Sequence, residues 1–409
     1  MRYVIIGNST AAVAAIEGIR SVDNVGEITV LTDEIYDAYG RPLISYYLWG
    51  KTTPEKMRYR PADFYEKNGV LLRRGETVVS IDPERKTVAL QSGEKVAYDK
   101  LLVAAGSRPF VPPMEGLETV QNKFSFMKFD DALALERAIC KDSRVLVVGA
   151  GLIGLKCVEG ILERVASVDV VDLADRILSS VLDEGGAATV RAFLEKKGVK
   201  FHLGDSVVAF SENEASLKSG GKIGFDVLVL AVGVRPNAEL VKDAGGETSR
   251  GIVTDDRQET SLKDVYAAGD CAESVDITDG RRKVLALLPN AYYQGRTAGI
   301  NMAGGEARLN DCMPLNAVGF FGLHVLTAGA YVGEVYEEHG ENTYKKLFVQ
   351  DGLLKGFILI GDVARAGIYT ALIRERTPLD SVDFEMLRKA PALAAFVAAE
   401  RREKLAKKV

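Results

Sequence analysis

Three glycines, Gly149, Gly151 and Gly154, follow the apolar run 144–148 at the spacing of a turn that binds a dinucleotide. In such a turn the first glycine permits a tight bend, the second lets backbone N–H groups approach a pyrophosphate, and the third lets helix and strand pack closely. The phosphates then lie at the positive end of the helix. Asp172 ends the next apolar run, where its carboxylate would accept hydrogen bonds from the adenosine ribose and repel a 2′-phosphate. The spacing therefore predicts an NAD(H) site, with NADP(H) less favoured.

The predicted NAD(H) contacts lie in the turn, in the first helical residues after it and at the ends of neighbouring strands: Gly149, Gly151, Leu152, Ile153, Gly154, Asp172, Arg176, Val232 and Gly233. The guanidinium of Arg176 weakens the preference against NADPH, because it could accept the 2′-phosphate. A glycine-rich turn without a ligand is the alternative interpretation.

A second and weaker fingerprint begins at Gly7, where Ser9 and Ala12 occupy positions usually taken by glycine. These residues are still small, but the backbone freedom of glycine is lost. Thr32 stands where a ribose-binding carboxylate is expected, so contact with the ribose would fall to one of the two acidic residues that follow it. Taken alone, this segment is also compatible with an empty turn.

The pattern of strand, helix and strand occurs twice in the chain. The predicted elements are a strand at 3–6, a helix at 11–19 and a strand at 28–31, then a strand at 144–148, a helix at 154–164 and a strand at 168–172. Further along, residues 98–109 resemble residues 225–236, because each is a buried strand that ends in glycine before Arg-Pro. Self-similarity at this range predicts two copies of one nucleotide-binding architecture.

A Gly-Asp motif stands in the segment 265–273, which follows Thr260 and precedes a predicted helix that opens with Leu-Pro-Asn at 288–290. Together with the two fingerprints, it resembles the pyridine nucleotide-disulfide oxidoreductase superfamily of flavoproteins, and the resemblance covers nearly the whole chain. The resemblance implies that Asp270 binds the ribityl chain of FAD. It also implies that the helix directs its positive N-terminus at the flavin and stabilises the negative charge of the reduced ring.

The FAD contacts that the resemblance implies follow the first dinucleotide fold and the Gly-Asp motif: Gly7, Ser9, Thr10, Ala11, Ala12, Thr32, Asp33, Glu34, Arg41, Pro42, Val79, Ala104, Ala105, Gly106, Arg108, Gly269, Asp270, Pro289, Asn290 and Ala291. The loop 39–48 resembles the flavin-facing loop of the nitrite-reductase-like and rubredoxin- or ferredoxin-reductase-like members, whose Arg-Pro packs along the isoalloxazine. NADH oxidase and coenzyme A disulfide reductase relatives carry a redox cysteine in this loop. Here the earliest cysteine is Cys140, so the thiol half-reaction of those enzymes lacks its nucleophile.

Lys156 stands two residues after the last glycine of the NAD(H) fingerprint, where many relatives have a glutamate that touches the nicotinamide. It is the one candidate for a side chain near the reacting ring, and a packing or surface role is the alternative. The segment 316–323 resembles the start of the C-terminal interface domain of the nitrite-reductase-like members. Phe320 and Phe321 in this segment would either form a wall of the flavin site or pack in the core.

The predicted fold class is α/β, with two Rossmann-like dinucleotide-binding domains, the FAD domain interrupted by the NAD domain, and a small C-terminal α+β domain. The expected boundaries are 1–108 and 229–308 for the FAD-binding domain, 109–228 for the NAD(P)H-binding domain and 309–409 for the C-terminal interface domain. The last domain is expected to contain alternating apolar segments at 344–349 and 353–360, read as strands, followed by helical patterns. Its basic end, 401–408, is predicted to be a solvated helix end, with a docking site for an acidic partner as the alternative.

Composition excludes several classes of function. The 409 residues carry a net charge of −5 and show no basic stripe, so a nucleic-acid partner is not expected. No apolar run reaches the roughly 18 residues of a membrane span and no leader precedes the first strand, so we expect a cytoplasmic protein. The four cysteines and three histidines are scattered without metal-binding spacing, which predicts no bound metal.

These patterns together predict an FAD-dependent NADH oxidoreductase. Because the cofactors would carry the chemistry, no catalytic side chain is required. The expected acceptor is a small electron-carrier protein, such as a rubredoxin or ferredoxin, or a partner redox subunit, and a homodimer through the C-terminal domain is also expected. Two alternatives stay open: an NADH oxidase that reduces oxygen, and a non-catalytic nucleotide-binding subunit of a redox complex.

Overall fold

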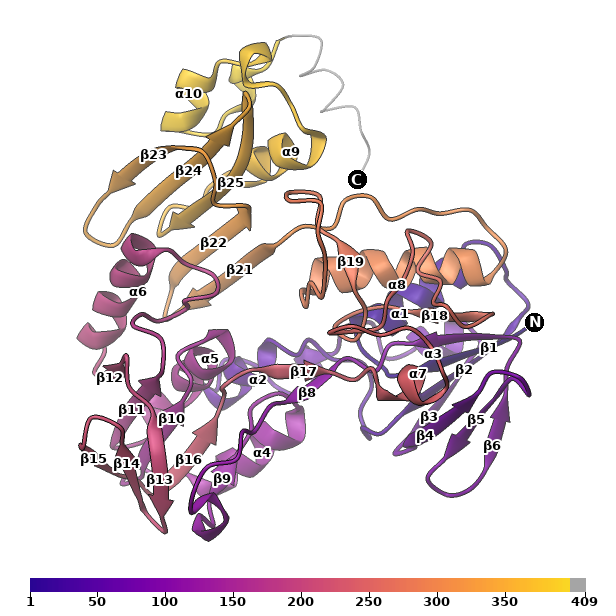
Figure 1. Cartoon of the computed structure of the whole chain (residues 1–409), viewed down its shortest axis with the longest axis horizontal. Coiled ribbons are helices and arrows are strands. Elements are labelled where there is room, and N and C mark those ends of the chain that lie inside the picture. Colours follow the sequence, from indigo (N-terminus) through magenta and orange to yellow (C-terminus); the bar gives the residue numbers. More distant parts are fainter. Residues whose placement is uncertain (398–409) are drawn as a thin grey trace. The chain divides into compact units, whose positions relative to one another are not determined.

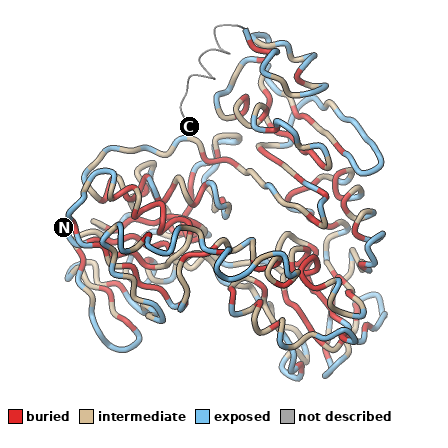
Figure 2. The backbone as a smooth tube through the Cα atoms, turned by 180° about the vertical axis from the view of Figure 1, so that it is seen from behind, coloured by how far each residue is buried: buried red, intermediate tan, exposed pale blue. Residues whose placement is uncertain are grey.

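The computed structural model describes residues 1–397, so the basic segment 401–408 lies outside the described residues. The chain divides into two compact units, each assembled from three segments that are distant in sequence (Figure 1). Unit 1 contains Met1–Val111, Met127–Glu136 and Gly233–Cys312, and unit 2 contains Pro112–Phe126, Arg137–Val232 and Met313–Val409. In both units the buried residues follow the strands of the sheets and the helices that cover them (Figure 2).

Unit 1 is built on a parallel sheet of five strands in the order β18-β7-β1-β2-β3. The strands are β1 (Arg2–Ile6), β2 (Glu27–Thr32), β3 (Val70–Arg74), β7 (Lys100–Val103) and β18 (Val265–Ala267). Tyr3 and Ile5 of β1 join one apolar cluster, whereas Val4 and Ile6 join another. Because side chains alternate across a strand, this continuous apolar run places core on both faces of the sheet.

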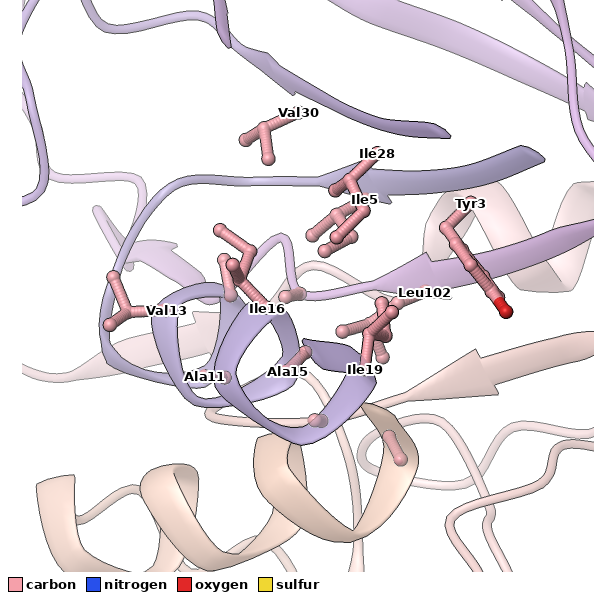
Figure 3. Packing of buried hydrophobic residues seen from close by; sticks show 14 of the residues in the cluster. Tyr3, Ile5, Ala11, Val13, Ala15, Ile16, Ile19, Ile28, Val30 and Leu102 are labelled. Carbon is pink, nitrogen blue, oxygen red and sulfur yellow. The ribbon is translucent and has the colours of Figure 1, made fainter. Parts of the chain in front are cut away.

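Two helices, α1 (Thr10–Arg20) and α8 (Leu288–Met302), contribute to the first of these clusters. Figure 3 shows Ile16 and Ile19 of α1 directed at the strands. The second cluster includes apolar side chains of a separate antiparallel sheet formed by β4 (Val78–Asp82), β5 (Thr87–Leu90) and β6 (Lys95–Ala97). The sheet therefore has helices on one face and a small sheet on the other.

Short elements complete unit 1. They are α2 (Leu43–Leu48), α3 (Phe64–Lys67), α4 (Phe129–Ala138, whose last residues belong to unit 2), α7 (Glu239–Asp243), β8 (Ser107–Pro109), β17 (Val234–Pro236), β19 (Ser274–Val275) and β20 (Arg282–Lys283). Strands β8 and β17 form a two-stranded antiparallel ribbon.

Unit 2 begins with a second copy of this architecture. Its parallel sheet has the order β12-β11-β10-β16-β9. The chain between β12 and β16 forms a small antiparallel sheet, β13-β14-β15. The elements are β9 (Lys123–Phe124), β10 (Arg144–Val148), α5 (Leu152–Ile161), β11 (Ser167–Asp172), α6 (Glu184–Lys196), β12 (Lys200–Leu203), β13 (Val207–Ser211), β14 (Glu214–Leu217), β15 (Lys222–Gly224) and β16 (Val227–Leu230). The repeated segments of the sequence thus form equivalent strands, β7 and β16, each next to the central strand of its sheet and second from one edge.

The C-terminal part of unit 2 is an antiparallel sheet of five strands in the order β21-β22-β25-β24-β23. Its elements are β21 (Leu315–Phe320), β22 (Leu323–Gly329), β23 (Glu334–His339), β24 (Tyr344–Gln350), β25 (Leu353–Ile360), α9 (Gly367–Glu375) and α10 (Phe384–Lys389). The strands predicted at 344–349 and 353–360 are therefore confirmed.

The structure confirms the predicted fold class, with two Rossmann-like folds and a C-terminal α+β region. The helix predicted at 154–164 is displaced: α5 begins at Leu152, because Gly151 is its N-cap, and ends at Ile161 before a short 3₁₀ turn. None of the helices within residues 1–397 has the length and apolar character that crossing a bilayer requires. The exact domain boundaries stay a prediction.

Candidate functional site

The first fingerprint turn connects β1 to α1. Gly7 has a φ of +100°, and a Cβ there would lie 2.2 Å from the carbonyl oxygen of Ala104, so the position requires glycine. Ser9 caps α1 with φ −133° and ψ −159°, an extended conformation that any residue adopts, so the missing glycine is not needed. The N–H of Val13 donates to Ser9 O at 3.0 Å and is the first bond of the helix. The three preceding N–H groups therefore have no acceptor within the helix and suit an anionic ligand.

Helices α1 and α8 meet backbone to backbone through glycines of α8. A Cβ on Gly295 would lie 2.1 Å from Ala11 O, and a Cβ on Gly299 would lie 2.2 Å from Ala15 O (the α1 alanines are labelled in Figure 3). Successive turns of one helix meet successive turns of the other, so the helices run in the same direction. Pro289 stands in the first turn of α8, where an N–H would have no helical acceptor. The positive N-terminal ends of the two helices therefore point in the same direction and lie at the same end of the sheet.

The Gly-Asp motif follows β18 directly. The N–H of Gly269, whose φ is +82°, donates to Gln294 Oε1 at 2.6 Å, which ties the motif to the first turns of α8. Asp270 is half-buried, and the hydrogen bond it accepts from the described residues is a long one, 3.4 Å from Ser107 Oγ. Burial raises the pKa of Asp270, although the charge of Arg41 opposes the shift. A carboxylate with so few donors fits the hydroxyl groups of an FAD ribityl chain.

The two acidic residues after β2, which were expected at the ribose, have partners of their own. Glu34 is buried, and its carboxylate accepts from Arg41 Nη2 at 2.5 Å and from Tyr39 OH at 2.7 Å. Asp33 is exposed and pairs with Lys128 Nζ at 2.6 Å. Thus Arg41 is held by Glu34 at the start of the loop 39–48, and a role of either carboxylate at the ribose stays a prediction.

The two repeated Arg-Pro segments pair with each other in the ribbon β8–β17, where Arg108 is the register partner of Arg235. The guanidinium of Arg108 lies 2.6 Å from a carboxylate oxygen of Glu239 at the surface. Val79 lies on β4 with an exposed side chain. Contact of Arg108 or Val79 with FAD therefore stays a prediction. The other predicted FAD residues lie after β7 (Ala104, Ala105, Gly106), within β2 (Thr32), in the first turns of α1 and α8 (Thr10, Ala11, Ala12, Pro289, Asn290, Ala291) and before α2 (Pro42).

The NAD(H) fingerprint turn in unit 2 uses its glycines in two different ways. A Cβ on Gly149 would lie 2.3 Å from Ala231 O, and a Cβ on Gly154 would lie 2.0 Å from Gly149 O, so both are required by packing. At Gly151, by contrast, no described atom beyond its chain neighbours lies within 4 Å of the added Cβ. Close packing beside an open cradle at the helix N-terminus fits a pyrophosphate. Leu152 and Ile153 open the helix, and Val232 and Gly233 follow β16.

Asp172, the last residue of β11, is hydrogen-bonded to the same turn. Its Oδ2 accepts the N–H of Ala150 at 2.6 Å, and its Oδ1 accepts the N–H of Ala174 at 2.8 Å. Each oxygen keeps a second lone pair, so the carboxylate is held in place and can still accept a ribose hydroxyl. Arg176 pairs through Nη1 with Asp175 at 3.0 Å, and its buried Nε has no partner within residues 1–397. The preference for NADH over NADPH stays a prediction.

Lys156 contacts the C-terminal sheet. Its Nζ forms an ion pair with the buried Glu159 and donates to the carbonyl oxygen of Gly319 at 3.1 Å. Glu159 Oε1 in turn accepts the N–H of Phe321 at 2.7 Å. Burial lowers the pKa of Lys156, and the neighbouring carboxylate opposes that shift. The sequence interpretation missed Glu159, and the signal that could have found it is the opposite charge three residues along one helix.

No disulfide joins the cysteines of residues 1–397, of which Cys140 is exposed and Cys157, Cys271 and Cys312 are buried. Burial raises the pKa of Cys271 to about 11 and also raises that of Cys157, so neither is poised as a thiolate. Within residues 1–397 no group of three or more His, Cys, Asp or Glu side chains could hold a metal ion.

Comparison with known proteins identifies the family. The family model described as pyridine nucleotide-disulphide oxidoreductase matches residues 1–295. The chain belongs to this family. A second family model, described as the rubredoxin NAD+ reductase C-terminal domain, matches residues 314–377. The protein is therefore an oxidoreductase that uses FAD and NADH, as the sequence predicted.

Two relatives and one solved structure show how far the similarity extends. The epsilon subunit of the NADH-dependent phenylglyoxylate dehydrogenase of Aromatoleum evansii is 33% identical over 391 residues, which cover 92% of each chain. The assimilatory nitrate reductase electron transfer subunit of Bacillus subtilis (strain 168) is 30% identical over 389 residues, 92% of this chain but 49% of that relative, so the chain spans about half its length. Putidaredoxin reductase, in its covalent complex with putidaredoxin, shares the fold with a TM-score of 0.88 at 24% identity, covering 96% of this chain and 98% of that chain.

Proposed function

We propose that this oxidoreductase passes electrons from NADH through FAD to a small electron-carrier protein, of the rubredoxin or ferredoxin kind, or to a redox subunit of a larger complex. The observation that carries the proposal is the loop 39–48, which contains no cysteine. Electrons on the flavin therefore have no thiol there to reduce, and within residues 1–397 the side chains form no cluster that could hold an iron–sulfur site. The electrons must leave to another molecule.

The comparisons support an electron-carrier acceptor. Residues 314–377 match the C-terminal domain of a rubredoxin reductase, and one relative is a subunit of an NADH-dependent dehydrogenase. Bound FAD would supply the chemistry that links two-electron hydride transfer from NADH to the one-electron transfers that carrier proteins accept. The protein's own groups bind and orient, so no side-chain nucleophile is needed.

In this proposal the first dinucleotide fold (1–108 and 229–308) binds FAD, the second (109–228) binds NADH, and residues 309–409 form the interface domain. The free N–H groups at the start of α1 hold the FAD pyrophosphate, Asp270 accepts hydrogen bonds from the ribityl hydroxyls, and the N-terminus of α8 stabilises negative charge. The N–H groups after Gly151 hold the NADH pyrophosphate, and Asp172 accepts from the adenosine ribose.

A cytoplasmic location and a homodimer through the interface domain belong to the same proposal. Strand β23 supports the dimer, because within residues 1–397 it lies at the edge of its sheet, where a strand offers backbone groups for pairing, and it exposes Val335. Light scattering on the purified protein tests the dimer, and a monomer at all concentrations would contradict it.

The function is tested by anaerobic titration of the purified protein. We expect a yellow protein whose visible flavin absorbance bleaches with NADH, at much lower concentration than with NADPH, and returns when oxidised rubredoxin or ferredoxin is added. A turnover rate with oxygen alone that equals the rate with every carrier would identify an NADH oxidase instead. A colourless protein that NADH does not change would contradict the proposal and favour a non-catalytic subunit.

A further inference from the structure

The turn between β21 and β22 has a backbone that its sequence does not favour. Phe320 and Leu323 are paired across the hairpin, so Phe321 and Gly322 form a two-residue loop, with φ values of +50° and +90°. Loops of two residues with positive φ at both positions favour Asn-Gly, and a bulky aromatic residue at positive φ is an outlier. Such outliers persist where surrounding contacts hold them, and they concentrate at functional sites. The contacts that hold this turn are therefore informative.

Two side chains of α5 hold the backbone of the turn on either side of Phe320. Lys156 Nζ donates to the carbonyl oxygen of Gly319 at 3.1 Å, and the carboxylate of Glu159 accepts the N–H of Phe321 at 2.7 Å. The two side chains also form an ion pair with each other, with relative exposures of only 14% and 1%. These two buried charged side chains bind the backbone before and after the fully buried Phe320, and so hold Phe321, the residue with positive φ, against the helix.

The same helix begins at the candidate pyrophosphate cradle. Gly151 is the N-cap of α5, and Leu152, its first residue, lies four residues, about 6 Å along the axis, before Lys156 and on the same face. The turn is therefore fixed close to the N–H groups proposed to hold the NADH pyrophosphate. Nothing about sheet packing alone requires a buried ion pair at this position, because a pair of apolar side chains would pack as well.

We propose that Lys156 and Glu159 are positioning residues for NADH, which hold the turn 320–323 beside the fingerprint helix so that the turn forms one wall of the nicotinamide nucleotide site. This inference rests on the proposed function of the second dinucleotide fold. Neither residue is assigned a part in hydride transfer, so their loss should weaken NADH binding more than it slows turnover at saturation.

A matched control exists in the same unit. Lys346 Nζ of β24 pairs at 2.7 Å with Asp183, which caps α6 by accepting the N–H of Gly186 at 2.9 Å. This pair also joins the C-terminal sheet to a helix of the second dinucleotide fold, but α6 carries no fingerprint. A general loosening of the sheet should therefore follow from Lys346→Met as readily as from Lys156→Met.

The test measures the melting temperature, the KM for NADH and kcat of the FAD-loaded full chain with ferricyanide as acceptor. For Lys156→Met we expect the KM for NADH to rise about tenfold, the loss of roughly 1.4 kcal/mol of binding, with kcat changed less than about twofold. Lys156→Arg keeps the charge and should stay near wild type, and Lys346→Met should lower the melting temperature while leaving KM within about twofold.

If Lys156→Met does not fold, because Glu159 is left buried without a counter-charge, the double variant Lys156→Met/Glu159→Met removes both charges and should fold with the same raised KM. An unchanged KM in the folded variants, or an equal rise in Lys346→Met, would overturn the inference. Failure of the wild-type flavin to bleach with NADH would instead refute the proposed function of the chain.

Discussion

The two uses of glycine in the NAD(H) fingerprint lead to opposite outcomes for the same substitution. Gly151→Ala adds a Cβ that meets no described atom within 4 Å, at φ −81°, which alanine adopts without strain. The variant should be as stable as wild type, or more stable by about 0.4–1 kcal/mol through the unfolded chain. Gly154→Ala places its Cβ 2.0 Å from the carbonyl oxygen of Gly149. Overpacking of this kind costs about 1–3 kcal/mol, and because the atom that the Cβ meets belongs to the backbone, we expect a cost above the roughly 1 kcal/mol that alanine gains over glycine in a helix.

The effect on NADH binding should be reversed. The new methyl group of Gly151→Ala lies in the proposed cradle and displaces the pyrophosphate from at least one N–H group. A hydrogen bond to a charged group contributes about 1.5–3 kcal/mol, so the KM for NADH should rise between roughly tenfold and a hundredfold. The folded fraction of Gly154→Ala should bind NADH with the affinity of the wild type.

Thermal unfolding and anaerobic flavin reduction, measured on the same preparations, separate these effects. FAD content, read from the visible absorbance, should stay at the wild-type level in Gly151→Ala, which shows that the first fold is intact. A Gly151→Ala protein with the wild-type KM for NADH would refute the interpretation of the open cradle. A Gly154→Ala protein with an unchanged melting temperature would refute the packing argument.

Three further outcomes are expected. Asp270→Ala should lose most of its FAD on gel filtration, because the ribityl hydroxyls lose a charged acceptor, and a protein that stays fully yellow would contradict this role. Gly295→Ala puts a Cβ 2.1 Å from Ala11 O and should be destabilised by about 1–3 kcal/mol. The control Gly367→Ala, with open space around its Cβ, should have the melting temperature of the wild type. Equal melting temperatures of the two variants would contradict the close contact between α1 and α8. Two backbone N–H groups and a tyrosine hydroxyl lower the pKa of Asp23 to about 2, below the unfolded value of about 3.9, so its contribution to stability is present above about pH 4 and is lost as the pH falls toward 2. Urea unfolding at several pH values should show that Asp23→Asn loses less stability than the wild type as the pH falls from about 4 toward 2. Parallel curves of stability against pH would contradict this contribution of Asp23.

The need for glycine at position 154 could be predicted from the sequence because it is local, whereas Gly7 and Gly149 are required by contacts with Ala104 and Ala231, which lie far along the chain. Gly149 and Gly154 lie in one turn, and the contact that demands glycine at position 154 is with position 149 itself. Ser9 was interpreted as a weakening of the first fingerprint because the sequence does not reveal its extended backbone. The repeated strands were likewise visible, since each is a continuous apolar run.

The partners of buried charged side chains could not be predicted in the same way. Glu159 contacts a turn more than 150 positions further along the chain, and no pattern within α5 names that turn. Glu34 was expected to face a ribose, but its carboxylate accepts from Arg41 and Tyr39 in a loop that the sequence interpretation assigned to the flavin. Both cases depend on tertiary packing, which brings together groups whose types are known but whose neighbours are not.

The contact between α1 and α8 also constrains how the protein is made. Residues 10–20 leave the ribosome long before residues 288–302, so the side of α1 that meets α8, with Ala11 and Ala15, stays uncovered until the chain has been made as far as α8. Pairing of segments so distant in the sequence slows folding, and this helix contact can form only after residues 288–302 have been made. A product truncated just before residue 288 would retain Gly7, Asp270 and every strand of the first sheet, yet it would lack the second helix needed to assemble the proposed flavin cradle.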